Sequence, residues 1–233
     1  RNEKALVLFV TAGDQPLSEL PAILEALVEG GADVIEVGIP FSDPFGEGPT
    51  IQASSQRALD RGTTPIAILD ALKPCNLSVP VVTMGYYNPV LRIGLSEFST
   101  ASAACGSTGT IISDLSPEEA EDWCAASQEA GIDTIFLAAP TSTPDRIEAA
   151  AKRSTGFVYA VSRTGVTGAE SVIPPDVADI VNRIRSHTQR PICVGFGVSK
   201  PEHVAMVCKV ADGAVVGSAL VDLLHRVWDG GKG

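Results

Sequence analysis

A single glutamate stands inside a short apolar run, Val34–Gly38. The run is apolar on both sides of the acid, which predicts a strand buried on both faces. Carboxylates are rarely buried without a reason, and burial raises the pKa of a carboxyl group until it exchanges protons near neutral pH. We therefore predict that Glu36 is a general acid or base. The alternative is a structural glutamate paired with a basic group.

The loop that follows this run carries two more acids, Asp43 and Glu47. It covers Ile39–Thr50, is rich in proline and glycine, and is long for a connection between a strand and a helix. Long ordered loops at such positions tend to be functional. We predict that the loop belongs to the same site as Glu36. The alternative for either acid is a surface charge on a solvated connector.

Glycines follow two later apolar runs, at Gly195 and Gly197 and again at Gly217, where Ser218 begins a predicted helix. Glycine lets the main chain approach a ligand closely, and main-chain N–H groups at a helix start bind anions. Barrels of alternating strands and helices often hold phosphate at these two strand ends. The pattern predicts a phosphate site, with ordinary turn glycines as the alternative.

The overall charge limits the classes of partner. The chain has 28 acidic and 17 basic side chains, a formal net charge of −11. This balance argues against nucleic acid, because a phosphate backbone requires a positive surface. A smaller anionic ligand must then be held by local main-chain dipoles, since the field of the whole protein opposes it.

Several kinds of chemistry lack the residues they need. No lysine falls at the carboxyl end of a predicted strand, which disfavours Schiff-base chemistry. The three histidines are expected at the surface or at helix ends, and no cluster has the spacing of metal ligands. The five cysteines form no CxxC pair and are expected as buried free thiols in a reducing compartment. What remains is a phosphate-bearing substrate handled by carboxylates.

Eight short apolar runs alternate with segments of helical periodicity. The predicted strands are Ala5–Thr11, Val34–Gly38, Val81–Met84, Thr110–Ile112, Thr134–Leu137, Phe157–Val161, Ile192–Gly195 and Ala214–Val216. Eight alternations in 233 residues predict an α/β fold, a (β/α)8 TIM barrel that forms one domain over residues 1–233. No apolar run reaches the roughly 18 residues that span a bilayer, and no signal peptide is recognised, so no membrane partner is expected.

Five sequence motifs follow one another along essentially the whole chain. The two longest are Glu36–Pro44 followed by Gly48–Gln52, and Ser162–Gly168; the others are Phe9–Asp14, Met84–Pro89 and Gly195–Val198. In this order they resemble the motifs of the tryptophan synthase α subunit family. The resemblance implies a lyase that splits indole-3-glycerol phosphate into indole and glyceraldehyde 3-phosphate.

The resemblance also implies roles for the acids. Glu36 matches the main acid/base, which protonates the indole carbon bearing the side chain and helps to deprotonate the glycerol hydroxyl. The protonated indole ring is the electron sink, so neither lysine nor metal is needed. Glu47 matches the second acid, which is an aspartate in the family and hydrogen-bonds to the indole N–H. The extra methylene moves the carboxylate by about 1.5 Å unless the loop adjusts, and such a misplacement can cost on the order of 100-fold in rate.

Other positions carry over one at a time. Tyr159 matches the active-site tyrosine, and Asp114 matches an aspartate near the subunit interface. Positions that match the walls of the indole pocket are Phe9, Met84, Ile111 and Leu137. Thr167 matches the loop threonine that closes toward the second acid. Positions that match the phosphate site are Gly168, Phe196, Gly197, Gly217 and Ser218.

The family usually works with a pyridoxal-phosphate β subunit in an αββα heterotetramer, and that subunit receives indole through a tunnel. The loops after the second and sixth strands, with Asn88-Pro89, would face this partner, and no cofactor is expected in this chain. The expected location is the cytoplasm, or the plastid stroma if the source is a plant. The family also has an extra N-terminal helix, and we expect no counterpart of it within residues 1–233.

Two other functions stay open at this point. One is a catalytically impaired subunit that mainly binds and activates a β subunit, because Glu47 replaces the family's aspartate. The other is a different phosphate-binding barrel enzyme, such as an isomerase of histidine or tryptophan synthesis. The long motifs argue against this second alternative.

Overall fold

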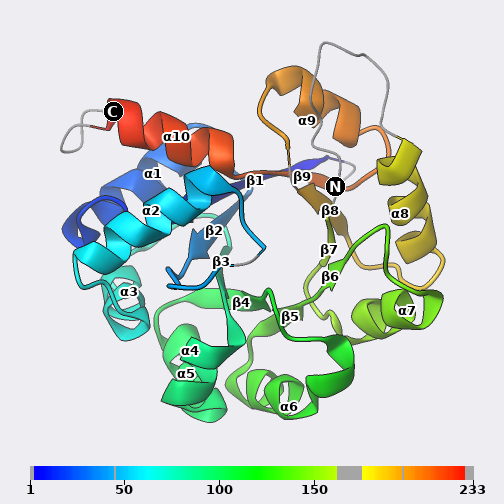
Figure 1. Ribbon diagram of the computed structural model, residues 1–233, viewed down its shortest axis with the longest axis horizontal. Coiled ribbons are helices and arrows are strands. Elements are labelled where there is room, and N and C mark those ends of the chain that lie inside the picture. The colour runs from blue at the N-terminus through cyan, green and yellow to red at the C-terminus, as the bar shows by residue number, and fades with distance from the viewer. Residues whose placement is uncertain (1–2, 45, 162–174, 196, 229–233) are drawn as a thin grey trace.

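A ring of parallel strands with helices outside it forms the structure (Figure 1). The computed structural model describes residues 3–44, 46–161, 175–195 and 197–228. The strands are β1 (Ala5–Thr11), β2 (Val34–Gly38), β3 (Val81–Gly85), β4 (Ser107–Ile112), β5 (Asp133–Ile135), β6 (Leu137–Ala138), β7 (Val158–Val161), β8 (Ile192–Gly195) and β9 (Gly213–Val216). The sheet order is β5-β4-β3-β2-β1-β9-β8-β7-β6.

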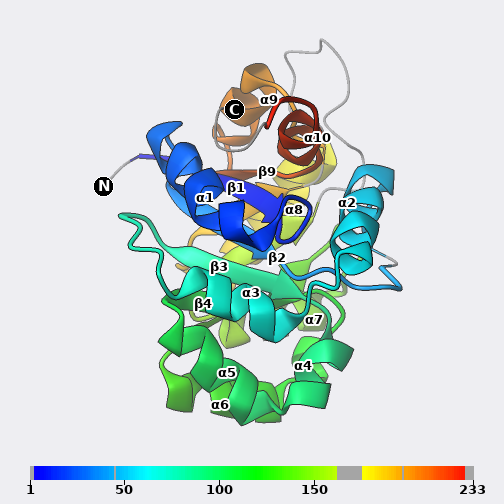
Figure 2. The same cartoon turned by 90° about the vertical axis from the view of Figure 1, so that its left-hand side faces the viewer.

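The helices follow the strands in alternation. They are α1 (Leu20–Glu29), α2 (Pro49–Asp60), α3 (Pro65–Leu72), α4 (Tyr87–Ile93), α5 (Leu95–Ala104), α6 (Glu121–Ala130), α7 (Pro144–Arg153), α8 (Pro175–Arg185), α9 (Pro201–Val207) and α10 (Ser218–Val227), with short 3-10 turns η1 (Leu17–Glu19) and η2 (Pro117–Glu119). Seen from the side, α1 and α3 lie across the outer face of the sheet (Figure 2). None of the helices in the described part of the chain is long and apolar enough to span a lipid bilayer.

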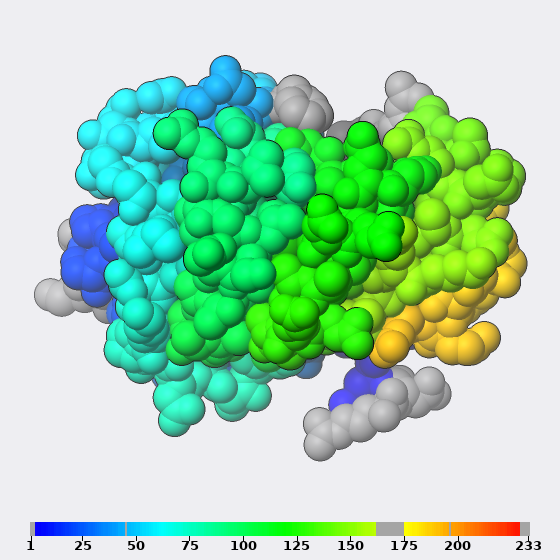
Figure 3. All heavy atoms as spheres, turned by 90° about the horizontal axis from the view of Figure 1, so that it is seen from below, coloured from blue at the N-terminus to red at the C-terminus, as the bar shows by residue number. Residues whose placement is uncertain are grey.

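On one outer face of the barrel, the segments lie side by side in the order in which they occur in the chain. Figure 3 shows this face as a continuous series of colours, through green and yellow-green to orange. Some helices pack beside the one before them in the chain, as α5 does with α6 and α7 with α8, whereas α2 packs beside α10. Short connections between consecutive elements are the rule in alternating α/β folds.

The barrel closes where β5 and β6 meet. The two segments are parts of one extended stretch, 133–138, that pairs with β4 through its first half and with β7 through its second. Phe136 separates them because its N–H donates to Ser154 Oγ (3.0 Å) instead of to a strand, while its carbonyl accepts the Tyr159 N–H (3.0 Å). The nine segments therefore correspond to the eight predicted strands, and the barrel prediction is confirmed.

The largest boundary error concerns β4. The strand begins at Ser107, three residues before the predicted start at Thr110. Ser107, Thr108 and Gly109 resemble a turn in sequence, but Ser107 and Gly109 pair with Val81 and Val82 of β3 across a register shift. Tertiary pairing here overrides the weak strand propensity of small polar residues.

The two faces of each strand bury different side chains, which explains why the runs are apolar throughout. Side chains alternate along a strand, so every second residue faces the inside of the barrel. Within β2, Ile35 and Val37 pack outward against the helices, whereas Glu36 lies between them and faces inward. The inward layer contains Val7, Phe9, Val82, Met84, Ile111, Ile135, Tyr159, Cys193 and Val215.

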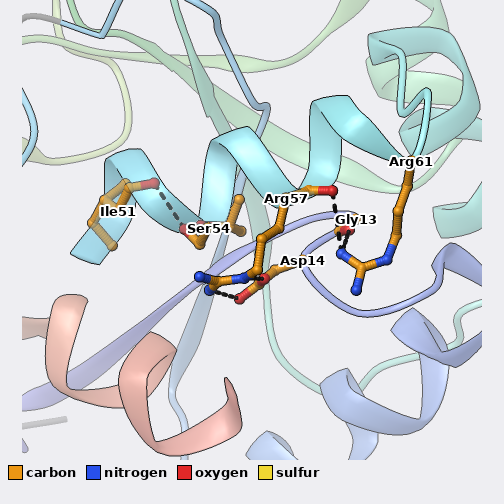
Figure 4. A network of polar contacts seen from close by, with 7 residues as sticks. Gly13, Asp14, Ile51, Ser54, Arg57 and Arg61 are labelled. Carbon is orange, nitrogen blue, oxygen red and sulfur yellow. Dashed lines mark hydrogen bonds and ion pairs between the residues drawn. The ribbon is translucent and has the colours of Figure 1, made fainter. Parts of the chain in front are cut away.

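A polar network fixes α2 to the end of β1 (Figure 4). Arg57 of α2 donates two hydrogen bonds to the Asp14 carboxylate, from Nε (2.6 Å) and from Nη2 (2.9 Å), and Asp14 is buried. Ser54 Oγ lies 2.7 Å from Thr11 Oγ1 of β1. The guanidinium of Arg61 donates to the Gly13 carbonyl (3.4 Å). Because α2 begins directly after the loop that carries Glu47, the network holds the far end of that loop in place.

Replacing Arg57 with methionine tests this anchor. The change leaves the buried Asp14 carboxylate without its bidentate partner, and removing one member of a buried pair is costly. Because Arg57 is partly exposed, we expect the free energy of unfolding to fall by roughly 2–3 kcal/mol, less than for a fully buried pair. Chemical denaturation measures it.

Arg146→Met is the matched control. Arg146 pairs with Glu118 at the surface, where both side chains are largely exposed, so its loss is expected to cost about 0.5 kcal/mol or less. Equal losses in the two variants would contradict the assignment of Arg57 as an anchor.

Candidate active site

A cavity opens at the carboxyl ends of the strands. It encloses about 720 Å³ of empty space, part of it at the open mouth, which is within the usual range for small-molecule sites. The residues that line it are Phe9, Glu36, Glu47, Gly48, Ile51, Met84, Tyr159, Gly197, Val198, Val215, Gly217 and Ser218. Eight of the thirteen residues predicted from the sequence are therefore brought together around one space.

Glu36 is the buried acid of this cavity. Its register partners are Phe9 on β1 and Val82 on β3, and its exposed fraction is 0%. Both carboxyl oxygens are buried without a hydrogen-bond partner among the described residues, so the structure provides no basic group to pair with it there. Burial raises the pKa of Glu36 from its usual 4.5 to about 8. Glu36 is therefore protonated at neutral pH and can donate a proton.

Two further inward side chains are affected by the same acid. Desolvation raises the pKa of Tyr159 well above its ordinary value, and the nearby Glu36 raises it further. Burial, again reinforced by Glu36, raises the pKa of the Cys193 thiol to about 12. Both groups stay neutral at physiological pH, so neither supplies a charged partner for Glu36.

Two strand-end glycines make room for the aromatic walls. A Cβ at Gly195 would overlap the Tyr159 hydroxyl, and a Cβ at Gly38 would overlap the ring of Phe9. Only glycine leaves space for these rings without a shift of the backbone or ring. The sequence contained the signal, a glycine closing an apolar strand, but not which ring it accommodates.

Glu47 reaches the cavity from the loop between β2 and α2. Burial raises the pKa of its carboxyl, and a hydrogen bond from the Tyr86 hydroxyl works in the opposite direction. Its Oε2 is buried and has no partner among the described residues. Despite the extra methylene, the Glu47 carboxylate thus lies at the wall of the cavity that contains Glu36.

Another part of the cavity wall, after β8 and β9, is suited to an anion. Gly197 has a φ of +83°, a conformation that favours glycine, and Gly217 is the N-cap of the ten-residue helix α10. No side chain in the described part of the chain caps α10, and the main-chain N–H groups of its first residues have no acceptors within the helix. Ser218 adds a hydroxyl at the same place. Together these donors and the helix dipole favour a phosphate.

The remaining predicted residues fall into two groups. Ile111 and Leu137 belong to the apolar cluster inside the barrel but are not among the residues that line the cavity. Thr167, Gly168 and Phe196 lie outside the described residues, as does the rest of the Ser162–Gly168 motif. Sequence reasoning missed Gly48, Ile51, Val198 and Val215 as wall residues, and it missed Tyr86 as the partner of Glu47.

The histidines in the described part of the chain are not among the residues that line this cavity. His203 lies in the first turn of α9, near a helix end as expected, and it is buried; its Nδ1 accepts the Ser199 N–H (3.3 Å). All five cysteines are free; Cys105 and Cys193 are buried, and the other three are partly exposed. Across the described ranges, no group of three or more histidine, cysteine or acidic side chains is placed to hold a metal ion.

The raised pKa of Glu36 predicts how stability depends on pH. Between about pH 5 and pH 8 the folded chain keeps a proton on Glu36 that the unfolded chain releases, so the free energy of unfolding falls as the pH rises through this window. Glu36→Gln removes the titration, and the decline relative to this variant should be on the order of 4 kcal/mol. Denaturation midpoints over the pH range measure it.

An exposed glutamate provides the control for this measurement. Glu25→Gln on α1 should leave the pH dependence of the parent protein unchanged. The assignment is wrong if the parent and Glu36→Gln lose stability in parallel as the pH rises.

Comparisons with known proteins agree with this geometry. The family model described as tryptophan synthase alpha chain matches residues 1–232. The tryptophan synthase alpha chain of Solibacter usitatus (strain Ellin6076) is 48% identical over 227 residues, which are 97% of this chain and 85% of that protein. The one from Dehalococcoides mccartyi is 45% identical over 97% of this chain and 89% of that protein.

Solved structures show the same architecture. A chain from the tryptophan synthase a2b2 complex of Pyrococcus furiosus superposes with a TM-score of 0.91 at 39% identity, over 98% of this chain and 94% of that chain. A chain of Mycobacterium tuberculosis tryptophan synthase gives 0.88 at 42% identity, over 96% and 86%. The chain therefore belongs to the family of tryptophan synthase alpha chains, which are lyases of tryptophan biosynthesis.

Proposed function

We propose that this chain cleaves indole-3-glycerol phosphate into indole and glyceraldehyde 3-phosphate, using Glu36 and Glu47 as its acid/base residues. The observation that carries the proposal is the position of Glu36. It is a buried carboxylic acid with a pKa of about 8 and no hydrogen-bond partner among the described residues, in a cavity that also contains a second carboxylate and the N-terminus of α10.

Glu36 alone can donate and recover the proton that the reaction requires. The neutral acid gives its proton to the indole carbon that bears the side chain, and the ring becomes an electron-poor cation. The resulting Glu36 carboxylate then takes the proton of the adjacent glycerol hydroxyl. The carbon–carbon bond breaks, its electron pair returns to the ring, and an aldehyde forms at the former hydroxyl carbon. Glu36 ends protonated, as it began.

Glu47 balances the charge that appears on the ring. When the indole carbon is protonated, positive charge spreads to the ring nitrogen and its N–H becomes more acidic. A carboxylate that accepts this N–H stabilises the charged intermediate more than the neutral substrate, which is the requirement for catalysis. The partnerless Oε2 of Glu47 supports this assignment, since it is a buried acceptor at the cavity wall.

The impaired-subunit alternative depends on the glutamate being misplaced. The loop instead brings Glu47 to the cavity wall, and Tyr86 binds its carboxylate there. The geometry therefore favours an active lyase over a subunit that only activates a partner.

We further propose that the chain works with a tryptophan synthase β subunit that carries the pyridoxal phosphate. The structural relative from Pyrococcus furiosus belongs to an a2b2 complex. In this chain Asn88 and Leu91 of α4 are exposed. Ser42 and Asp43, in the loop between β2 and α2, are exposed as well. Asp114 accepts the Tyr87 N–H (2.7 Å) and so fixes the start of α4.

Glu36→Gln provides the direct test of the reaction. The amide is nearly the same size but cannot donate a proton as a carboxylic acid does, so we expect indole release to fall by roughly 1,000-fold or more. Binding of intact indole-3-glycerol phosphate, followed by calorimetry, should persist within about threefold. Release near the parent rate would remove Glu36 from the proposed role.

Glu47→Asp tests whether the loop is built for the longer acid. Aspartate withdraws the carboxylate by about 1.5 Å from both Tyr86 and the cavity, so we expect kcat to drop on the order of 10-fold, with a smaller change in KM. Indole release is assayed with and without a β subunit. A kcat above that of the parent would show instead that glutamate is a poor substitute at this position.

A further inference from the structure

Tyr86 is a buried tyrosine at the end of β3 that lies in the Met84–Pro89 motif but received no predicted role. It directly follows the strand, forms the N-cap of α4, and has an exposed fraction of 3%. The next residue, Tyr87, donates its N–H to the Asp114 carboxylate (2.7 Å). The main chain around Tyr86 is therefore held by the sheet on one side and by Asp114 on the other.

The Tyr86 side chain contacts the loop between β2 and α2, which carries Glu47, at two points. Its ring stacks on Phe41 near the start of the loop, with the centroids 4.8 Å apart and the planes at 26°. Its hydroxyl accepts the N–H of Gly46 (3.3 Å) near the loop's end. One rigid side chain anchored on β3 thus holds two points of a loop that belongs to β2 and α2.

The same hydroxyl donates its proton to the Glu47 carboxylate. A phenol has one proton to donate and lone pairs to accept with, so the bonds to Gly46 and Glu47 use both capacities at once. Desolvation and the neighbouring Glu47 raise the pKa of Tyr86, which keeps the hydroxyl a donor throughout the physiological range. Oε2 of Glu47 has no partner among the described residues, so the hydrogen bond from Tyr86 is made to Oε1. Oε2 is therefore available to a ligand.

A glutamate needs such support more than an aspartate does. It has one more rotatable bond, so its carboxylate explores a wider region and loses more entropy when it is fixed. A charge-assisted hydrogen bond from a buried donor restricts that freedom before the substrate arrives.

We propose that Tyr86 is the positioning residue that orients the Glu47 carboxylate, so that Oε2 accepts the indole N–H of the substrate. The proposal depends on the proposed function for the identity of the substrate. The contact between Tyr86 and Glu47, and its effect on the carboxylate, can be tested without any turnover.

The first experiment measures the titration of Glu47 itself. The side-chain carboxyl ¹³C signals of glutamate-labelled protein are followed against pH, and the Glu47 signal is identified by its loss in Glu47→Gln. Tyr86→Phe keeps the ring on Phe41 but removes the hydroxyl. Because the hydrogen bond lowers the pKa of Glu47, we expect that pKa to rise by about one unit or more in Tyr86→Phe.

Tyr87→Phe is the matched control, since it removes a hydroxyl from the neighbouring residue. It should leave the Glu47 titration within about 0.2 units of the parent value. Thermal unfolding of each variant shows that the fold is retained. An unchanged Glu47 titration in a folded Tyr86→Phe protein would overturn the proposal.

The second experiment measures single-turnover indole release with the β subunit present. Tyr86→Phe should lower the rate on the order of 10-fold with KM within about twofold, because the loss falls on the transition state. In a Glu47→Ala background the same change should cost less than about twofold, since a residue that acts through Glu47 has nothing left to orient. Equal losses in both backgrounds would overturn the positioning role.

The two experiments separate the two claims. If the parent protein with its β subunit releases no indole, the proposed function fails, and the titration of Glu47 in Tyr86→Phe still decides the contact. If the parent protein releases indole normally but the pKa of Glu47 is unchanged in Tyr86→Phe, the proposed function is supported and the proposed role of Tyr86 is wrong.

Discussion

The site depends on the cost of removing one carboxyl group from water. Glu36 lies in the inward layer of the barrel among apolar side chains, and its oxygens have no partner in the described part of the chain. An ionised carboxylate in such surroundings is strongly unfavourable, so the group keeps its proton to about pH 8. The barrel provides this environment because β2 faces inward at Glu36, while Ile35 and Val37 pack against the helices.

The second acid lies in a different environment. Glu47 is only partly buried and receives hydrogen-bond support from Tyr86, which offsets some of the desolvation that raises its pKa. Two carboxyl groups facing one cavity therefore differ in their tendency to ionise, which is how an acid and a base are assigned at one pH. The difference has a structural source: Glu36 is fixed by a strand in the interior, whereas Glu47 is held by a loop whose ends are tied to Tyr86 and, through α2, to Asp14.

Patterns within single segments were sufficient to predict the barrel, the buried acid and the strand-end glycines that line the cavity, because each depends on local periodicity or on one residue type in an unusual place. The contacts between segments could not be predicted in this way. Nothing in the sequence links Gly195 to the ring of Tyr159, or Tyr86 to Glu47, since these pairs form only when distant strands become neighbours. The same reason explains the division of the fifth strand at Phe136, where a serine 18 residues later takes the N–H.

The distribution of charge in the cavity also explains how an acidic protein accommodates a phosphate ester. The net charge of −11 repels such a ligand at a distance, and two ionised carboxylates beside it would repel it further. Burial keeps Glu36, Tyr159 and Cys193 neutral, so these three groups add no negative charge to the cavity. The proposed phosphate end lies at the N-terminus of α10 and at Gly197, which line the same cavity. The desolvation that keeps a proton on Glu36 thus also removes a negative charge from the proposed path of the substrate.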